Sequence, residues 1–249
     1  MQQRKKLMKL VIVSQNIREE FKVLKIAVIT ASIGANKLLE PITFEGVDYH
    51  AFINYEDENS KWITHPIIPF SVDNQYKNRR DAKVYKVLPF AFLPNYDYYF
   101  WVDSTHILEQ NPHDVIEKYL KDSDVAVFKH PDRDCIYTEA KGVKRVGFDH
   151  PNLIDDQLAF YKDMCYPEHN GLYELPVRVQ RNTKLTQQMG WMWWEQICMF
   201  SSRDQISFPF VCHQLGIKPT ILPGVANTIR GNKIMPQLVL SNHSRKTQW

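Results

Sequence analysis

Residues 97–108 read DYYFWVDSTHIL, and the way this stretch ends decides which fold the sequence predicts. Apolar and aromatic side chains run from Tyr98 to Val102, and an acid, two hydroxyl residues and a histidine follow at once. A short apolar run rich in aromatic and β-branched residues is typical of a buried strand. The stretch therefore predicts a buried strand that ends on Asp103.

Runs of the same kind recur along the chain and alternate with segments of helical pattern. Buried strands are predicted at 26–29, 47–53, 98–102, 125–128 and 219–222, and helices at 80–92, 112–121, 136–146 and 203–215. This alternation predicts an α/β fold in which helices flank a mostly parallel sheet. Ligands bind beyond the carboxyl ends of the strands in such sheets, so we expect Asp103 to face a crevice.

The composition is that of a globular chain without a strongly charged surface. The 249 residues are 44% hydrophobic, which is enough for a sizeable core in one large domain or two small ones. The net charge of +3 arises from 31 basic and 28 acidic residues that are mostly interspersed, which argues against a nucleic-acid partner. We predict a single domain at 24–249, with a strand or extension at 1–23 before it and a tail at about 230–249 that closes over a ligand.

Cysteine spacing and apolar runs bear on where the protein works. The four cysteines, Cys135, Cys165, Cys198 and Cys212, lie far apart and form no Cys-x-x-Cys pair. We therefore expect reduced thiols in a cytoplasmic protein, without a zinc site or a disulfide framework. The basic start MQQRKKLMKLVIV is interrupted by Lys9 and is too short for a signal peptide. No stretch approaches about 18 uninterrupted apolar residues, so no membrane span is predicted.

The segment 78–88 has a basic face if it is helical. At helical spacing Arg79, Lys83 and Lys86 share one face, while Val84 and Leu88 share the opposite one. Such a basic face is often a solvated helix surface. Near the edge of the sheet, the same cations would meet an anionic ligand such as a diphosphate. The pattern allows both interpretations.

Asp103 has two interpretations of equal weight. A carboxylate at a strand end suits Mg²⁺ or Mn²⁺, and a neighbouring hydroxyl or imidazole can assist it. Asp is also a common cap of turns and helices. His106, taken alone, is more often a packing residue than a ligand.

Residues 130–140 follow another predicted strand and concentrate polar side chains. His130, Arg133 and Glu139 could hold a polar ligand at the carboxyl end of that strand. Asp132 or Asp134 could instead cap a helix that begins near residue 136. A cap requires neither the histidine nor the arginine, so the ligand-binding interpretation is favoured.

Residues 190–208 hold three closely spaced tryptophans, Trp191, Trp193 and Trp194. Aromatic side chains of this size either pack in a core or line a pocket of the size of a sugar. Glu195 and Asp204 are the nearest acids, and either could act as a base, a nucleophile or a hydroxyl acceptor. A helix cap with a local ion pair between Arg203 and Asp204 explains the same residues equally well.

Taken in this order, five of these segments resemble the glycosyltransferase-like domain family of the TOD1/MUCI70 type. The resemblance covers roughly residues 25–215 and is carried by VITASIG (28–34), the helix with Arg80, Lys83 and Lys86 ending in KVLPF, YYFWVDST (98–105), FKHPDRDCIYTEA (128–140) and WWEQICMFSSRDQISF (193–208). It implies a GT-A-like, Rossmann-like domain that transfers a sugar from a nucleotide diphosphate donor, usually with Mn²⁺ or Mg²⁺.

The resemblance also implies roles for particular residues. Together with the polar residues after the strand at 125–128, the expected donor-binding set is Thr30, Ala31, Asn54, Arg80, Lys83, Asp103, Ser104, His130, Arg133, Glu139 and Gln205. Asp103 matches the first acid of an Asp-x-Asp metal motif, but the second position is Thr105, a poorer cation ligand. His243 would be a further metal ligand near the end of the chain. Cationic side chains in place of a metal are the alternative.

The expected function is sugar transfer from a nucleotide sugar, with a UDP-sugar favoured, to a hydroxyl of a glycan or another acceptor. Asp204 is the expected nucleophile or orienting group if configuration is retained, and Glu195 the expected base if it is inverted. Trp191, Trp193 and Trp194 would form an acceptor or sugar wall. A carbohydrate-binding protein with a decayed site and a metal-dependent nucleotidyltransferase are the alternatives. The oligomeric state stays open.

Overall fold

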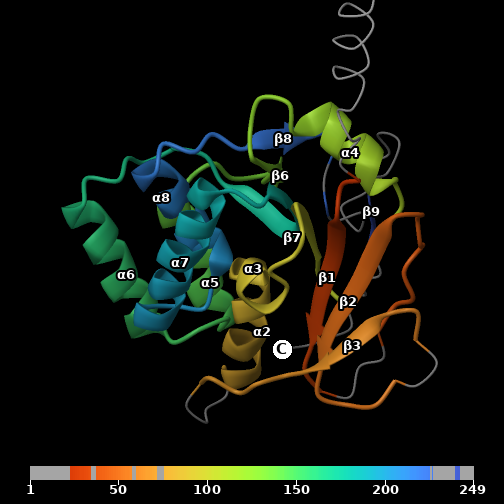
Figure 1. Cartoon of the computed structure of the whole chain (residues 1–249). Coiled ribbons are helices and arrows are strands. Elements are labelled where there is room, and N and C mark those ends of the chain that lie inside the picture. Colours follow the sequence, from red (N-terminus) through yellow and green to blue (C-terminus); the bar gives the residue numbers. More distant parts are fainter. Residues whose placement is uncertain are drawn as a thin grey trace, which may run out of the picture.

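A seven-stranded sheet forms the centre of the computed structural model, which describes residues 23–34, 38–57, 60–71, 76–224, 226 and 239–241 (Figure 1). The order across the sheet is β3-β2-β1-β4-β7-β6-β8. The strands are β1 (Ile26–Ser32), β2 (Val47–Ile53), β3 (Ile63–Pro66), β4 (Tyr98–Val102), β6 (Val125–Lys129), β7 (Tyr173–Arg181) and β8 (Thr220–Leu222). A separate pair joins β5 (His106–Leu108) to β9 (Val239–Ser241).

The sheet is mostly parallel, as the sequence predicts. β1 pairs in parallel with β2 and β4, and the β2–β3 and β6–β8 pairs are parallel too. Only β7 among these strands runs the other way, between β4 and β6. The sequence does not predict β7, because Pro176 and the alternating charged residues hide its burial. In the structure Arg178 is 1% exposed and Gln180 fully buried.

Seven helices connect the described strands. They are α2 (Lys77–Val87), α3 (Pro89–Phe92), α4 (Pro112–Tyr119), α5 (Ile136–Val146), α6 (Pro151–Asp163), α7 (Lys184–Met199) and α8 (Asp204–Gln214). The helix predicted at 80–92 is in fact two helices, because the residue before a proline avoids the α conformation and the chain breaks at Leu88, before Pro89. α7 is a further correction, since the sequence predicts no helix there. Thr183 and Thr186 form its capping box.

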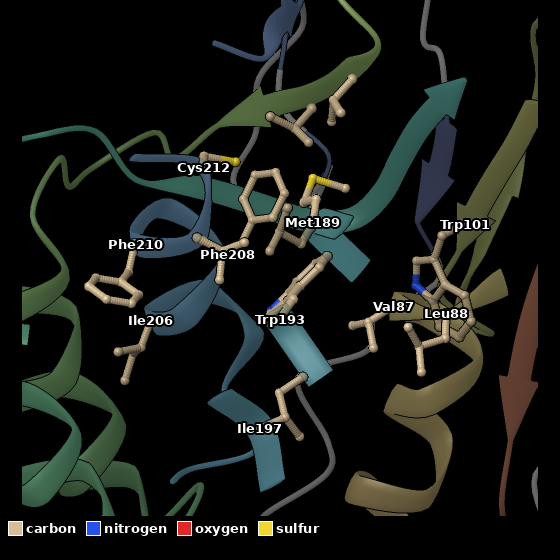
Figure 2. Close-up of a cluster of buried hydrophobic side chains, with 14 of the residues drawn as sticks. Val87, Leu88, Trp101, Met189, Trp193, Ile197, Ile206, Phe208, Phe210 and Cys212 are labelled. Carbon is tan, nitrogen blue, oxygen red and sulfur yellow. The ribbon is translucent and has the colours of Figure 1, made fainter. Parts of the chain in front are cut away.

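Alternate residues of the strands feed two apolar cores, one on each face of the sheet. Ala27 and Ile29 of β1 point into the core beneath α2, α5, α6, α7 and α8, whereas Ile26 and Val28 point into the core on the α4 side. Figure 2 shows part of the first core, where Trp193 of α7 packs against Phe208 of α8. The helices are thereby fixed around the carboxyl end of β4. Within the residues that can be described, no helix is both long and apolar enough to cross a membrane.

Candidate active site

A polar cleft of about 280 Å³ opens where the chain leaves β4. Its walls come from α2, the segment after β4, the segment from β6 into α5, the segment after α5, the start of β7 and the start of α8. The lining residues are Lys83, Lys86, Asp103, Thr105, His106, His130, Arg133, Glu139, Phe148, Glu174, Leu175, Pro176, Arg203, Asp204 and Gln205. The predicted position of Asp103 at a crevice is therefore what the structure shows.

Asp204 lies at the centre of the charge network in this cleft. It is the first residue of α8, and its side chain is 4% exposed. Its Oδ2 accepts hydrogen bonds from Lys83 Nζ at 2.7 Å and from Lys86 Nζ at 2.5 Å. The two lysines are three residues apart on α2, so their side chains leave the helix on the same face. A negative charge at a helix N-terminus is also favoured by the helix dipole.

The lysines determine the charge state of Asp204. Burial by itself would raise the pKa of this carboxyl, but Lys83, Lys86 and Arg203 together hold the pKa well below its usual range. Asp204 is therefore a permanent carboxylate and a weak base. Burial lowers the pKa of Lys83 to about 8, although Asp204 opposes this change. Lys83 thus loses its proton at a lower pH than an ordinary lysine does.

The basic face of α2 is not a solvated surface. The Lys86 side chain is only 1% exposed, and its ammonium lies 5.5 Å from the centre of the Trp101 ring. The carbonyl of Lys86 accepts a hydrogen bond from the guanidinium of Arg178, a fully buried residue of β7. Burial lowers the pKa of Arg178 to about 9. Lys83 and Lys86 therefore pair with a carboxylate of the protein itself, Asp204, and binding of an anionic ligand by this face stays a prediction.

Asp103 faces the cleft with a partly exposed side chain. Its Oδ1 accepts a hydrogen bond from the indole of Trp101 at 2.6 Å and lies 3.6 Å from Lys86 Nζ. No hydrogen bond is recorded for its second carboxylate oxygen among the described residues, and the carboxylate caps no helix. The Oγ1 of Thr105 is hydrogen bonded to His106 Nδ1 at 3.0 Å.

A cation at this strand end would find few protein ligands. In the part of the chain that the structure describes, no three His, Cys, Asp or Glu side chains gather in an arrangement that could hold a metal ion. Of the predicted metal ligands, Asp103 is the one that could bind a cation here, through its Oδ2. His243 lies outside the described residues.

His130, Arg133 and Glu139 come together at the rim of the cleft. His130 Nδ1 accepts hydrogen bonds from the backbone N–H groups of Asp132 and Arg133, so a neutral His130 carries its proton on Nε2. Glu139 is 4% exposed and pairs with Arg133 at 2.8 Å. The alternative of an aspartate cap is not realised, because the N-cap of α5 is Cys135 and Asp134 pairs with His169.

Five of the predicted donor-binding residues do not line this cleft. Thr30 and Ala31 are buried at the end of β1. Asn54 follows β2, where its Oδ1 accepts a hydrogen bond from the Gly34 N–H at 3.0 Å, and it lines a separate cavity of about 530 Å³. The guanidinium of Arg80 donates to the carbonyls of Ile197 and Phe200, both at 2.6 Å, and therefore holds the end of α7. Ser104 is next to Asp103 but does not line the cleft.

The three tryptophans do not form one wall. Trp193 is fully buried, its indole N–H donates to Ser207 Oγ at 3.0 Å, and no ligand could reach it (Figure 2). Trp191 is 55% exposed and packs against Phe90, whereas Trp194 packs against Phe70. The reason is helical geometry, since successive side chains of α7 leave the axis about 100° apart.

Glu195 follows Trp194 on α7, and its side chain is exposed. It does not line the cleft. Of the two acids predicted to be catalytic, Asp204 is therefore the one that the fold places in the cleft.

Several residues of the cleft are absent from the predicted set, namely Lys86, Phe148, Glu174 and Arg203. Lys86 belongs to the basic face that the sequence predicts at 78–88, three residues from Lys83, but not to the predicted donor-binding set. Arg203 precedes Asp204, and the sequence assigns it only a local ion pair. Its guanidinium in fact lies 3.8 Å from Glu139 and 4.6 Å from the centre of the Phe148 ring. No sequence pattern indicates a role for Glu174, because the strand that carries it is not predicted.

Comparison with known proteins places the chain among glycosyltransferase-like sequences. The sequence model of the family described as TOD1/MUCI70, glycosyltransferase-like domain, matches residues 42–232. An Arabidopsis thaliana protein named "Probable hexosyltransferase MUCI70" is 28% identical over 151 residues. That match covers 56% of this chain and 26% of the Arabidopsis protein, so the chain corresponds to about a quarter of that protein's length.

Solved structures with a similar chain path include three glycosyltransferases. The apo bifunctional glycosyltransferase WbbM is 10% identical with a TM-score of 0.46, over 83% of this chain and 40% of that one. Apo mouse xyloside xylosyltransferase 1 is 9% identical with a TM-score of 0.45, over 80% and 84%. The galactosyltransferase LgtC, in complex with donor and acceptor sugar analogs, is 9% identical with a TM-score of 0.42, over 81% and 73%.

Proposed function

Because the chain belongs to the TOD1/MUCI70 glycosyltransferase-like domain family, we propose that it transfers a sugar from a nucleotide diphosphate donor to a hydroxyl acceptor. The observation that carries this proposal is the buried Asp204 carboxylate, held by two lysine ammoniums in the cleft beyond β4. The favoured donor is a UDP-hexose. The name of the Arabidopsis relative supports the hexose and does not mention the nucleotide.

Asp204 is proposed to orient the donor sugar. Both lysines bond to Oδ2, which leaves Oδ1 to accept hydrogen bonds from sugar hydroxyls or to face the reacting carbon. A carboxylate with a strongly lowered pKa is a poor proton acceptor, which supports this role over that of a general base. Electrostatic groups fixed before the reaction lose little free energy in reorganisation, and the lysines fix Asp204 in that way.

The charge balance of the cleft bears on the leaving diphosphate. The cationic side chains are Lys83, Lys86, Arg133 and Arg203, and the anionic ones are Asp103, Asp204, Glu139 and Glu174. As many anions as cations line the cleft, so most of the positive charge is already compensated. This balance supports the proposal that Mn²⁺ or Mg²⁺ accompanies the donor, with Asp103 as its protein ligand. When bound, such a cation would neutralise charge on the departing diphosphate.

The direct test measures nucleotide release from a panel of nucleotide sugars, with Mn²⁺, with Mg²⁺ and with EDTA. We expect release from one or a few donors, stimulated by a divalent cation and by an acceptor. Silence with every donor and metal would overturn the enzyme proposal and favour a carbohydrate-binding protein. Turnover of nucleotides that carry no sugar would instead indicate a nucleotidyltransferase.

Two predictions fall outside what the described residues can address. One is closure of the tail at about 230–249 over the donor, and the other is the cytoplasmic location. Both stay predictions, and proteolytic protection of the tail by donor and microscopy of the tagged chain would check them.

A further inference from the structure

A second cavity, of about 760 Å³, lies beside the cleft and has no assigned role. It is formed by the N-terminal half of α2, the start of α6, the C-terminal end of α7 and the segment before α2. Its volume is in the range of sites that bind small molecules or short oligosaccharide units. Its lining is mainly aromatic and apolar, with Phe70, Tyr76, Trp194 and Phe200 as the aromatic members.

Three segments contribute to both the cavity and the cleft, so the two spaces are neighbours. On α2, Arg80 lines the cavity and Lys83 lines the cleft. In the segment after α5, Phe148 lines the cleft and Asp149 the cavity. Between α7 and α8, Phe200 lines the cavity, whereas Arg203 lines the cleft. A ligand in the cavity would therefore contact segments that also border the cleft that holds Asp204.

The partition between the two spaces is built from paired polar groups. Two guanidiniums lie near the Phe148 ring, with Arg79 at 5.2 Å and Arg203 at 4.6 Å from its centre. Asp149 is fully buried and accepts hydrogen bonds from the N–H and the hydroxyl of Ser202, both at 2.6 Å. Ser202 is followed directly by Arg203 and Asp204. Its hydrogen bonds to Asp149 therefore connect a residue that lines the cavity to the chain segment that carries the Asp204 carboxylate.

The lining matches the chemistry of a sugar chain. Sugar rings present apolar C–H faces that stack on aromatic side chains, and hydroxyls that need hydrogen-bond partners. The Trp194 ring is partly exposed, and Asn152 and His150 add exposed polar groups from the start of α6. The charged groups of the cavity, Arg80 and Asp149, already have partners, which disfavours a strongly ionic ligand.

We infer that this cavity binds the acceptor, and that the acceptor is an oligosaccharide. The role as an acceptor site rests on the proposed function, because it is the neighbouring cleft that makes a bound sugar chain a substrate. Binding of the oligosaccharide does not depend on turnover and can be measured without a donor.

The test is binding of the full chain, detected through an N-terminal affinity tag, to a printed panel of oligosaccharides in the absence of donor. The variants are Trp194→Ala, Asn152→Ala and, as a matched control, Trp191→Ala. Trp191 is an exposed indole of the same helix that does not line the cavity. We expect Trp194→Ala to weaken binding about tenfold, as loss of an aromatic stacking partner implies. We expect Asn152→Ala to weaken it less and Trp191→Ala to leave it unchanged.

The outcomes separate this inference from the proposed function. Melting temperatures show whether each variant is folded. Weaker binding by folded Trp194→Ala and Asn152→Ala supports the sugar site even if no donor is turned over. Failure of the unchanged protein to bind any printed oligosaccharide overturns the inference, whether or not nucleotide is released. Equal binding by Trp194→Ala and Trp191→Ala overturns it as well. Asn152 is exposed, so its variant keeps the test valid if Trp194→Ala fails to fold.

Discussion

At the level of single residues, Asp204 depends on Lys83 and Lys86 for both its charge and its position. A buried carboxylate is unfavourable unless it is paired, and here two ammoniums bond to one oxygen. The arrangement holds the pKa of Asp204 well below its usual range, so the carboxylate is ionised at neutral pH. It also means that a change of any member alters the charge of the whole group.

Asp204→Asn should keep the side-chain volume but remove the charge that orients the donor. We expect transfer to fall by about 100-fold or more, as for other preorganised electrostatic groups, while the nucleotide still binds. Rates of nucleotide release and calorimetry with the free nucleotide would measure the two effects. The control is Asp134→Asn, an exposed acid that pairs with His169 away from the cleft. Transfer at the original rate by Asp204→Asn would remove Asp204 from the proposed mechanism.

The lowered pKa of Lys83 predicts a pH dependence. Burial lowers this pKa to about 8, so the free enzyme loses the Lys83 charge as the pH rises through that value. If the charged form is the active one, kcat/KM should fall on the alkaline side of about pH 8. The check is a profile of kcat/KM from pH 6 to pH 10, repeated with Lys83→Arg. Arginine keeps its charge throughout, so an alkaline fall that persists unchanged in the variant would assign it to another group.

Asp103→Ala tests the proposed cation ligand. We expect the variant to lose the part of nucleotide affinity that depends on Mn²⁺, because the Asp103 side chain is partly exposed at the cleft and only its Oδ1 is hydrogen bonded among the described residues. Calorimetry with the nucleotide, with and without Mn²⁺, measures this part. Asp114→Ala, which removes an exposed acid of α4, is the control. Identical Mn²⁺ stimulation in Asp103→Ala and the unchanged protein would count against the ligand role.

At the level of elements, the position of the two lysines depends on how closely α7 crosses α2. Gly190 of α7 allows this approach, because a Cβ there would lie 2.5 Å from the carbonyl oxygen of Val87 and 2.8 Å from the Phe90 ring. The Val87 carbonyl is part of α2 itself and cannot swing away. The contact lies one residue from Lys86, so this crossing and the cleft share the same stretch of helix.

Gly190→Ala should therefore destabilise the protein, although glycine to alanine in a helix interior normally stabilises it. We expect a loss of about 1–3 kcal/mol in the free energy of unfolding, the range found for overpacked sites. Urea unfolding would measure it. Gly142→Ala in α5 is the matched control, since its nearest neighbour is the flexible end of Arg133 at 3.1 Å. Equal stability changes in the two variants would show that the α2–α7 contact can relax.

Elements with a strong local pattern could be predicted, and those without one could not. β1, β2, β4, β6 and β8 each contain a short apolar run, and all five are present near their predicted positions. β7 carries Arg178 and Gln180 into the interior, so its burial has no counterpart in its hydrophobic pattern. In α7 apolar residues are spread around the helix, so the sequence does not show in which directions the three tryptophans point.

At the level of the whole molecule, the cleft exists because distant segments meet at the carboxyl end of β4. Lys86 and Asp204 are 118 residues apart in sequence, and Arg80 reaches carbonyls more than 115 residues away. The cleft and the larger cavity lie side by side because α2, the segment after α5 and the segment before α8 border both. In our proposal this adjacency brings donor and acceptor together.

By itself the sequence determined the α/β class, the strand that ends on Asp103 and the family, because these follow from local apolar runs and from motifs in a fixed order. It also placed His130, Arg133, Glu139 and Asp204 among the candidates, since each follows a strand end or begins a helix. Only the tertiary structure decided which of the candidates meet. It paired both lysines with Asp204, turned Arg80 toward the end of α7 and sent three neighbouring tryptophans in three directions. The physical reason is that such contacts depend on how helices pack across the sheet, and packing is set by segments far apart in the chain.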